Sequence, residues 1–211
     1  MASNDYHFVT RWRVQGDVKE AFDIISDAAD LSRWWPAVYL DAQVLEPGDP
    51  GNHDVGRVVS LHTKGYLPYT LRWQFRVVEV APYQRIVLEP AGDFIGRGVW
   101  TFEQDGEWIN IVYDWDVQAN KPLVRRYSLV FRPIFAANHY WAMRTGELSL
   151  KLELERRRAQ TPEEHAQLDE PPQPTTSSIV PLTLAVSGFW IGLGVAVVAI
   201  ARWLRGRSRL I

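Results

Sequence analysis

The sequence predicts an α+β domain in which a curved antiparallel sheet of about seven strands wraps a long C-terminal helix. Apolar and polar residues alternate in several segments between residues 6 and 118, which indicates half-buried strands. Short segments rich in Gly, Pro, Asn and Asp separate these strands, and helix-forming residues fill 123–158. The 211-residue chain has no cysteine, which excludes disulfides and thiolate metal sites. Its formal net charge of −2 argues against nucleic-acid binding.

The first predicted strand is 6–15, where large apolar residues alternate with Arg11 and Arg13. Asp114 and Asp116 alternate in the same way in the last predicted strand. If the two strands are neighbours, these charges can pair across them and help to set the register.

Two short helices are predicted after the first strand. Asp17 followed by Glu20 is a capping-box pattern, and apolar residues at helical spacing continue it to residue 29. A second short helix is expected over 31–35, where Pro36 ends it.

A meander of antiparallel strands is expected from Val38 to Gln118. One face of this sheet is predicted to be lined by large aromatic side chains, and the other to be polar. The predicted turns are 46–54, 64–68, 80–84, 90–98 and 104–107.

The last helix is predicted to run from residue 134 to residue 158, after an interruption at Pro133. The segment 148–155 also alternates with period two, so a strand remains an alternative there, although its residues favour a helix. As a helix, the segment is apolar on two faces, which suggests contacts on both sides. One face carries Ile134, Trp141, Leu148 and Leu152, and the other carries Met143, Leu150 and Leu154.

Three further segments follow the predicted domain 1–158. Residues 159–178 are rich in proline and acidic residues, which is typical of a disordered linker. Residues 179–201 carry no charge and would span roughly 34 Å as a helix, so we predict a transmembrane anchor. Residues 202–211 form a basic tail.

The anchor predicts a single-pass membrane protein with two possible orientations. The basic tail favours a cytoplasmic C-terminus, whereas the lack of a visible signal peptide favours a cytoplasmic domain, which we prefer. Gly188, Gly192 and Ala196 share one face of the predicted anchor and would allow a homodimer.

Six segments of the chain match a known family. They are 17–22 (DVKEAF), 30–36 (DLSRWWP), 73–80 with Pro82 and Ile86, 92–100, 113–117 (YDWDV) and 138–147. In these segments, and in an order of elements that is that of the helix-grip fold, the chain resembles the START and polyketide-cyclase superfamily (SRPBCC, Bet v 1-like). The resemblance spans about residues 5–158 and implies an elongated cavity between sheet and last helix for an apolar ligand. Members include lipid carriers, quinone-binding proteins and aromatase/cyclases, so the resemblance does not choose an activity.

The predicted ligand-binding residues are mostly large and apolar, which suits a lipid, isoprenoid or polycyclic guest. The alternative is that these rings only fill the core. The predicted lining consists of Trp12, Trp35, Leu61, Tyr69, Trp73, Phe75, Trp100, Phe102, Ile111, Tyr113, Trp115, Phe135, His139 and Met143.

Polar chemistry is sparse in the sequence. His139 and Tyr113 are the acid/base candidates if the protein is an enzyme, although a structural role is the simpler interpretation. Tyr69 and Glu147 are further candidates for polar contacts inside the cavity. The five histidines show no metal-ligand spacing, and the sequence predicts neither a metal nor a cofactor.

The sequence is compatible with three functions. The first is membrane-tethered binding or transfer of a hydrophobic small molecule, with the loop 49–54 or the hairpin tip 65–68 moving to admit it. The second is an enzyme of the polyketide cyclase/dehydratase type. The third is a protein-interaction module with a filled core and no cavity.

Overall fold

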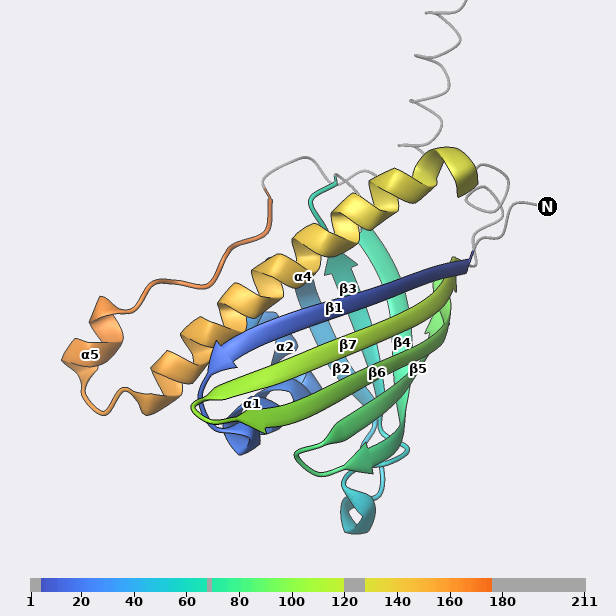
Figure 1. The fold of residues 1–211 in the computed structure, drawn as a ribbon. Coiled ribbons are helices and arrows are strands. Elements are labelled where there is room, and N and C mark those ends of the chain that lie inside the picture. The colour runs from blue at the N-terminus through green and yellow to red at the C-terminus, as the bar shows by residue number, and fades with distance from the viewer. Residues whose placement is uncertain (1–4, 68–69, 120–127, 176–211) are drawn as a thin grey trace, which may run out of the picture.

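The computed structural model describes residues 5–67, 70–119 and 128–175 (Figure 1). The predicted membrane segment 179–201 lies outside the described residues, as do its small-residue face (Gly188, Gly192, Ala196), the basic tail 202–211 and Tyr69. Within the described ranges, none of the helices combines the length and apolar character that crossing a bilayer requires.

The sheet has seven strands, as predicted, and all its neighbouring strands are antiparallel. Their spatial order is β1-β7-β6-β5-β4-β3-β2, so a hairpin meander is closed by pairing of the first strand with the last. The strands are β1 (Asp5–Gln15), β2 (Tyr39–Glu46), β3 (Val58–Lys64), β4 (Thr70–Ala81), β5 (Arg85–Gly92), β6 (Phe94–Asp105) and β7 (Trp108–Ala119).

The first and last strands are neighbours, so the condition for the expected charge pairs is met, but the charges pair with other residues. The β1–β7 register places Arg13 opposite Asn110 and Asp114 opposite Val9. Arg13 instead pairs with Asp105 at 2.9 Å, and Asp114 with His7 at 2.9 Å. Alternation shows which residues share a face of a strand, whereas the register depends on where the connecting segments end.

The two short helices after β1 are confirmed. The first, α1 (Val18–Ser26), begins at Asp17, whose side chain accepts a hydrogen bond from the Lys19 N–H. It ends earlier than predicted because Asp27 leaves helical geometry, and a 3-10 turn, η1 (Ala28–Asp30), follows. The second helix, α2 (Leu31–Trp34), ends before Pro36 as expected.

The predicted turn over 90–98 is wrong. β5 continues to Gly92 and β6 begins at Phe94, so Gly96 and Gly98 lie inside a strand. At Gly98 an added Cβ would lie 2.7 Å from the Tyr113 hydroxyl and 2.9 Å from the Trp115 ring. The glycine therefore makes room for rings from the neighbouring strand, which a reading of glycine as a turn signal misses.

The long last helix, α4 (Ser128–Arg158), lies along β1 over the open edge of the curved sheet (Figure 1). The helical interpretation of 148–155 is confirmed, but Pro133 lies inside the helix rather than before it. Met143, Leu150 and Leu154 are buried, so this predicted stripe packs into the core. The opposite stripe differs, because Leu148 stays exposed.

In the segment predicted to be a disordered linker, residues 159–175 contain a helix and an extended stretch that contacts the domain. Thr161 and Glu164 form a reciprocal capping box that begins a further helix, α5 (Pro162–Gln167). Residues 169–175, here called the strap, then run back along α4 (Figure 1). Composition alone predicts disorder because the contacts that hold the strap come from distant parts of the chain.

A nearly buried carboxylate joins α2 to α4. Glu153 is 3% exposed and accepts hydrogen bonds from Arg33 at 2.6 and 2.8 Å and from Arg157 at 2.8 Å. Burial acts to raise the pKa of Glu153, but the hydrogen bonds from the two arginines outweigh it and hold the pKa below its usual value.

Glu153→Gln should destabilise the fold by about 1–3 kcal/mol at pH 7, because it leaves two guanidinium groups without their shared carboxylate. The lowered pKa of Glu153 in the folded state means that its contribution is present above the unfolded pKa of about 4.3 and is lost as pH falls below it. Urea unfolding at several pH values should therefore show less acid destabilisation in the variant. The exposed neighbour Glu155→Gln is the control, and equal effects of both variants would contradict the assignment.

Candidate functional site

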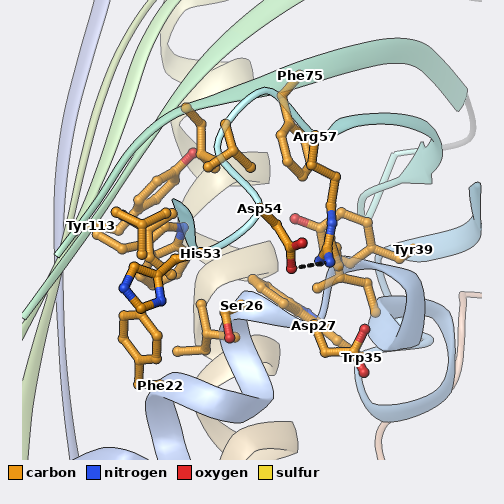
Figure 2. Close-up of a pocket in the computed structure, with 18 of the residues that line it drawn as sticks. Phe22, Ser26, Asp27, Trp35, Tyr39, His53, Asp54, Arg57, Phe75 and Tyr113 are labelled. Atoms are coloured by element: carbon orange, nitrogen blue, oxygen red, sulfur yellow. Dashed lines mark hydrogen bonds and ion pairs between the residues drawn. The ribbon is translucent and has the colours of Figure 1, made fainter. Parts of the chain in front are cut away.

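A cavity of about 410 Å³ lies between the concave face of the sheet and the helices α1 and α2 (Figure 2). Its volume is in the range of small-molecule sites, and most of its wall is apolar. The lining residues are Phe22, Ile25, Ser26, Asp27, Ala28, Leu31, Trp34, Trp35, Tyr39, His53, Asp54, Arg57, Trp73, Phe75, Val77, Val80, Ile86, Leu88, Trp100 and Tyr113.

Charged side chains of this cavity come from two loop segments (Figure 2). Asp27 follows α1, while His53, Asp54 and Arg57 belong to the connection between β2 and β3. Asp54 and Arg57 form an ion pair, drawn as a dashed line in Figure 2. We call these four residues the polar rim.

The β2–β3 connection, which supplies three of the four rim residues, has a backbone held by specific hydrogen bonds. His53 and Asp54 both adopt the left-handed region, with φ of 51° and 61°. The Asp49 side chain accepts a hydrogen bond from the Gly51 N–H at 2.9 Å, and backbone bonds join Asp49 to Val55 and Asp54. Two consecutive non-glycine residues in this conformation persist only where the surrounding contacts hold them.

A second, smaller cavity of about 150 Å³ lies at the other end of the interior. It is bounded by the N-terminal half of α4, by β1 and by the β3–β4 hairpin. The lining residues are Tyr6, Phe8, Trp35, Val38, Tyr39, Thr63, Lys64, Gly65, Leu71, Trp73, Phe94, Tyr113, Trp115, Val117, Phe135, Asn138, His139, Ala142 and Met143.

Four aromatic residues line both cavities and form the wall between them: Trp35, Tyr39, Trp73 and Tyr113. Trp35 and Tyr39 meet edge to face with ring centroids 5.1 Å apart. Tyr113 stacks on Trp100 at 4.1 Å. The wall is thus built from rings at the end of α2 and on strands β2, β4 and β7.

Both tyrosine hydroxyls of the wall stay protonated. Burial raises the pKa of Tyr39, and burial together with the proximity of Tyr39 raises the pKa of Tyr113 well above its usual value. A protonated phenol donates one hydrogen bond, so each hydroxyl can bind a carbonyl or ether oxygen of a guest.

His139 lies in the second cavity and not in the larger one. Its ring stacks on Phe8 with centroids 4.2 Å apart, and its Nε2 lies 3.4 Å from the Thr10 hydroxyl. Burial lowers the pKa of His139 to about 4, so the imidazole is neutral at physiological pH.

Most predicted lining residues reach one of the two cavities. Trp35, Trp73 and Tyr113 line both; Phe75 and Trp100 line the larger; Trp115, Phe135, His139 and Met143 line the smaller. The structure does not place Trp12, Leu61, Phe102 or Ile111 at either cavity, since they are packed into the core with at most 4% exposure.

Glu147, predicted to make polar contacts inside the cavity, lines neither of the two cavities. Its carboxylate binds Lys151 at 2.9 Å and lies 3.4 Å from the Arg13 N–H, so it faces the β1 edge. Sequence reasoning missed the polar rim, because its residues come from two separate segments. Asp27 lies in a stretch predicted to be helical, and His53 and Asp54 lie in a predicted turn. The same reasoning missed Tyr39, which follows the Trp-Trp-Pro motif and begins β2.

No group of His, Asp and Glu side chains suited to a metal ion occurs in the part of the chain that the structure describes. The polar groups that line the two cavities include the hydroxyls of Tyr39 and Tyr113, the neutral imidazole of His139, the side chains of Lys64 and Asn138, and the polar rim.

A family profile described as "Polyketide cyclase / dehydrase and lipid transport" matches residues 6–151, which contain the whole sheet and both cavities. The chain belongs to this family. That membership confirms the superfamily resemblance; it does not test the predicted membrane anchor. No curated protein sequence matches the chain.

Solved structures agree on the fold. The Zhui aromatase/cyclase from a Streptomyces species is 17% identical with a TM-score of 0.60, over 74% of this chain and 96% of that one. A Thermus thermophilus protein is 13% identical with a TM-score of 0.58, over 73% and 100%. A START superfamily protein from Mycobacterium smegmatis is 12% identical with a TM-score of 0.51, over 72% and 98%. At these identities the likeness is one of fold.

The buried imidazole makes folding stability depend on pH. The pKa of His139 is about 4 in the folded state and about 6.5 in the unfolded state. As the pH is lowered, the unfolded chain therefore binds the proton first, and the free energy of unfolding should decrease from pH 6.5 to pH 4. His139→Phe keeps a ring against Phe8 but removes the titration, so the difference in unfolding free energy between pH 7 and pH 5 should shrink. His165→Gln, at an exposed site on α5, should leave that difference unchanged. An unaltered difference in His139→Phe would contradict the assignment.

Proposed function

We propose that this protein binds a hydrophobic or amphipathic small molecule, such as a lipid, isoprenoid or polyketide-like compound, and holds or transfers it at a membrane. The observation that carries the proposal is the 410 Å³ cavity, whose wall is apolar and aromatic. Such a wall excludes water and gains free energy from covering apolar surface, by roughly 25 cal/mol per Å². The family description, which includes lipid transport, supports the same class of guest.

The polar rim suggests which end of the guest carries its polar group. Arg57 and Asp54 pair with each other, so a guest is not required to neutralise either charge. A hydroxyl, carbonyl or headgroup near the rim would share their hydrogen bonds, while the rest of the guest lies against rings such as Phe75 and Trp100. The predicted anchor 179–201 motivates the membrane as source or acceptor.

Filling the larger cavity tests this proposal. Val80→Trp places an indole at the lining of the cavity, so binding of an NBD-labelled fatty acid should weaken tenfold or more. Val9→Trp adds the same ring on the half-exposed outer face of β1 and should bind like the parent protein. Fluorescence titration measures both, and mass spectrometry of organic extracts identifies any apolar molecule that co-purifies. Equal binding by both variants, or no apolar ligand across repeated preparations, would refute the proposal.

An enzyme of the cyclase or dehydratase type is the second candidate, and one observation favours it. Tyr113 and His139 line the same small cavity, one as a protonated hydroxyl donor and the other as a neutral imidazole that can accept a proton. The cavity itself disfavours the third hypothesis, an interaction module with a filled core.

If the protein is such an enzyme, Tyr113→Phe and His139→Ala should each lower turnover of a linear polyketide thioester at least a hundredfold while ligand binding persists. Product analysis by mass spectrometry measures the cyclised or dehydrated compound. Tyr140→Phe, a substitution on the exposed side of α4, is the control. Absence of turnover in the parent protein, or full activity in both cavity variants, would leave binding and transfer as the function.

A further inference from the structure

We propose that the strap fixes the orientation of the domain, so that the β3–β4 hairpin end rests on the membrane and the polar rim points away from it. This inference rests on the proposed anchorage of residues 179–201 in a bilayer. A domain held in this way has one orientation relative to the bilayer, and its smaller cavity faces the lipid.

The first half of the strap is held by α4. The Arg156 guanidinium donates a hydrogen bond to the Asp169 carbonyl at 2.8 Å and forms an ion pair with Glu170 at 3.2 Å. Pro171 is buried and lies with Leu152 around one surface pocket. The strap thus covers part of the apolar stripe of α4 that does not face the sheet.

The end of the strap is held by the β3–β4 hairpin. The ammonium group of Lys64, a residue only 3% exposed, donates a hydrogen bond to the Thr175 carbonyl. The Thr175 hydroxyl lies 3.5 Å from the Tyr66 carbonyl oxygen. The chain therefore leaves the described domain at the hairpin, as the end of the orange segment in Figure 1 shows.

The distance from this point to the apolar segment is short. Ile179 is four residues after Thr175, so the two are at most about 14 Å apart. The headgroup layer on one side of a bilayer is roughly 5–8 Å thick. Without the strap, the 20 residues 159–178 could reach roughly 65 Å. The strap thus brings the hairpin end to the bilayer surface once Ile179 reaches the hydrocarbon.

The side chains at this end suit an interface. Tyr66 at the hairpin is 60% exposed and meets Trp141 of α4 edge to face at 5.9 Å. Tyr140, which precedes Trp141 on α4, is 56% exposed. Aromatic side chains with a polar tip gain free energy at the headgroup level, where one part of the ring is apolar and the other hydrated.

The orientation assigns different roles to the two cavities. The smaller one is lined by Lys64, Gly65 and Asn138 at the hairpin end, so it lies next to the lipid. Arg57 of the polar rim immediately precedes β3, whereas Lys64 ends it at the hairpin. The two residues are thus separated by the length of this extended strand. A guest taken from the bilayer would reach the larger cavity by passing the four-ring wall.

The test uses the full chain, whose lack of cysteine allows single labelling sites. Ala137→Cys is exposed on α4 beside the hairpin end, and Glu103→Cys is exposed near the β6–β7 turn at the far end of the sheet. Each is labelled with NBD and reconstituted into phosphatidylcholine vesicles that contain doxyl-labelled lipid. The inference expects severalfold stronger quenching at 137 than at 103.

Two matched insertions distinguish orientation by the strap from attachment by a flexible tether. About 15 Gly/Ser residues placed after Thr175 add roughly 20 Å of flexible chain beyond the strap, so quenching at 137 should drop toward that at 103. The same insertion between Ala159 and Gln160 leaves the path from Thr175 to Ile179 unchanged, so quenching should persist. A chain that floats with the vesicles but shows equal quenching at both labels overturns this inference alone. A chain that does not float overturns both the membrane tether and the inference.

Discussion

The structure depends on the position of one indole, that of Trp35, at the end of α2. Its ring meets Trp12 at 5.6 Å and Tyr39 at 5.1 Å, and its Nε1 donates to the Thr145 hydroxyl at 3.3 Å. Gly146 admits the ring against the α4 backbone, where an added Cβ would lie 2.2 Å from the indole. One side chain thereby joins the short helices, the sheet and the long helix, and it also divides the interior. Packing and cavity shape are consequently coupled here.

Much of this architecture could be predicted from the sequence because its signals are local. Strand alternation, the Asp17 cap and Pro36 act within a few residues, and they located the sheet and the short helices. The strap could not be predicted, since its order depends on Arg156 and Lys64, whose proximity exists only after folding. The division of the cavity was likewise hidden, because the alternation that locates the aromatic face does not reveal which rings touch.

The candidate site combines a largely apolar interior with three polar side chains that are uncharged at pH 7, those of Tyr39, Tyr113 and His139. The hydroxyls of Tyr39 and Tyr113 keep their protons and His139 stays neutral, so the interior carries no titratable net charge at pH 7 from these groups. In the larger cavity the charged side chains lie on the rim, where Asp54 and Arg57 neutralise each other. The apolar part of that cavity favours the uncharged part of a guest, whether the outcome is transport or chemistry. The smaller cavity differs, because the Lys64 ammonium contributes to its lining.

The pairing of β1 with β7 has a consequence for how the chain acquires its fold. Every other strand pair joins consecutive strands, whereas β1 pairs with a strand about one hundred residues later, for example Trp12 with Ile111. Contacts of such long sequence separation carry a large loop-closure entropy and form late. During synthesis the N-terminal strand must wait for the last strand to leave the ribosome, and until then its apolar side, including Trp12, needs protection from other chains.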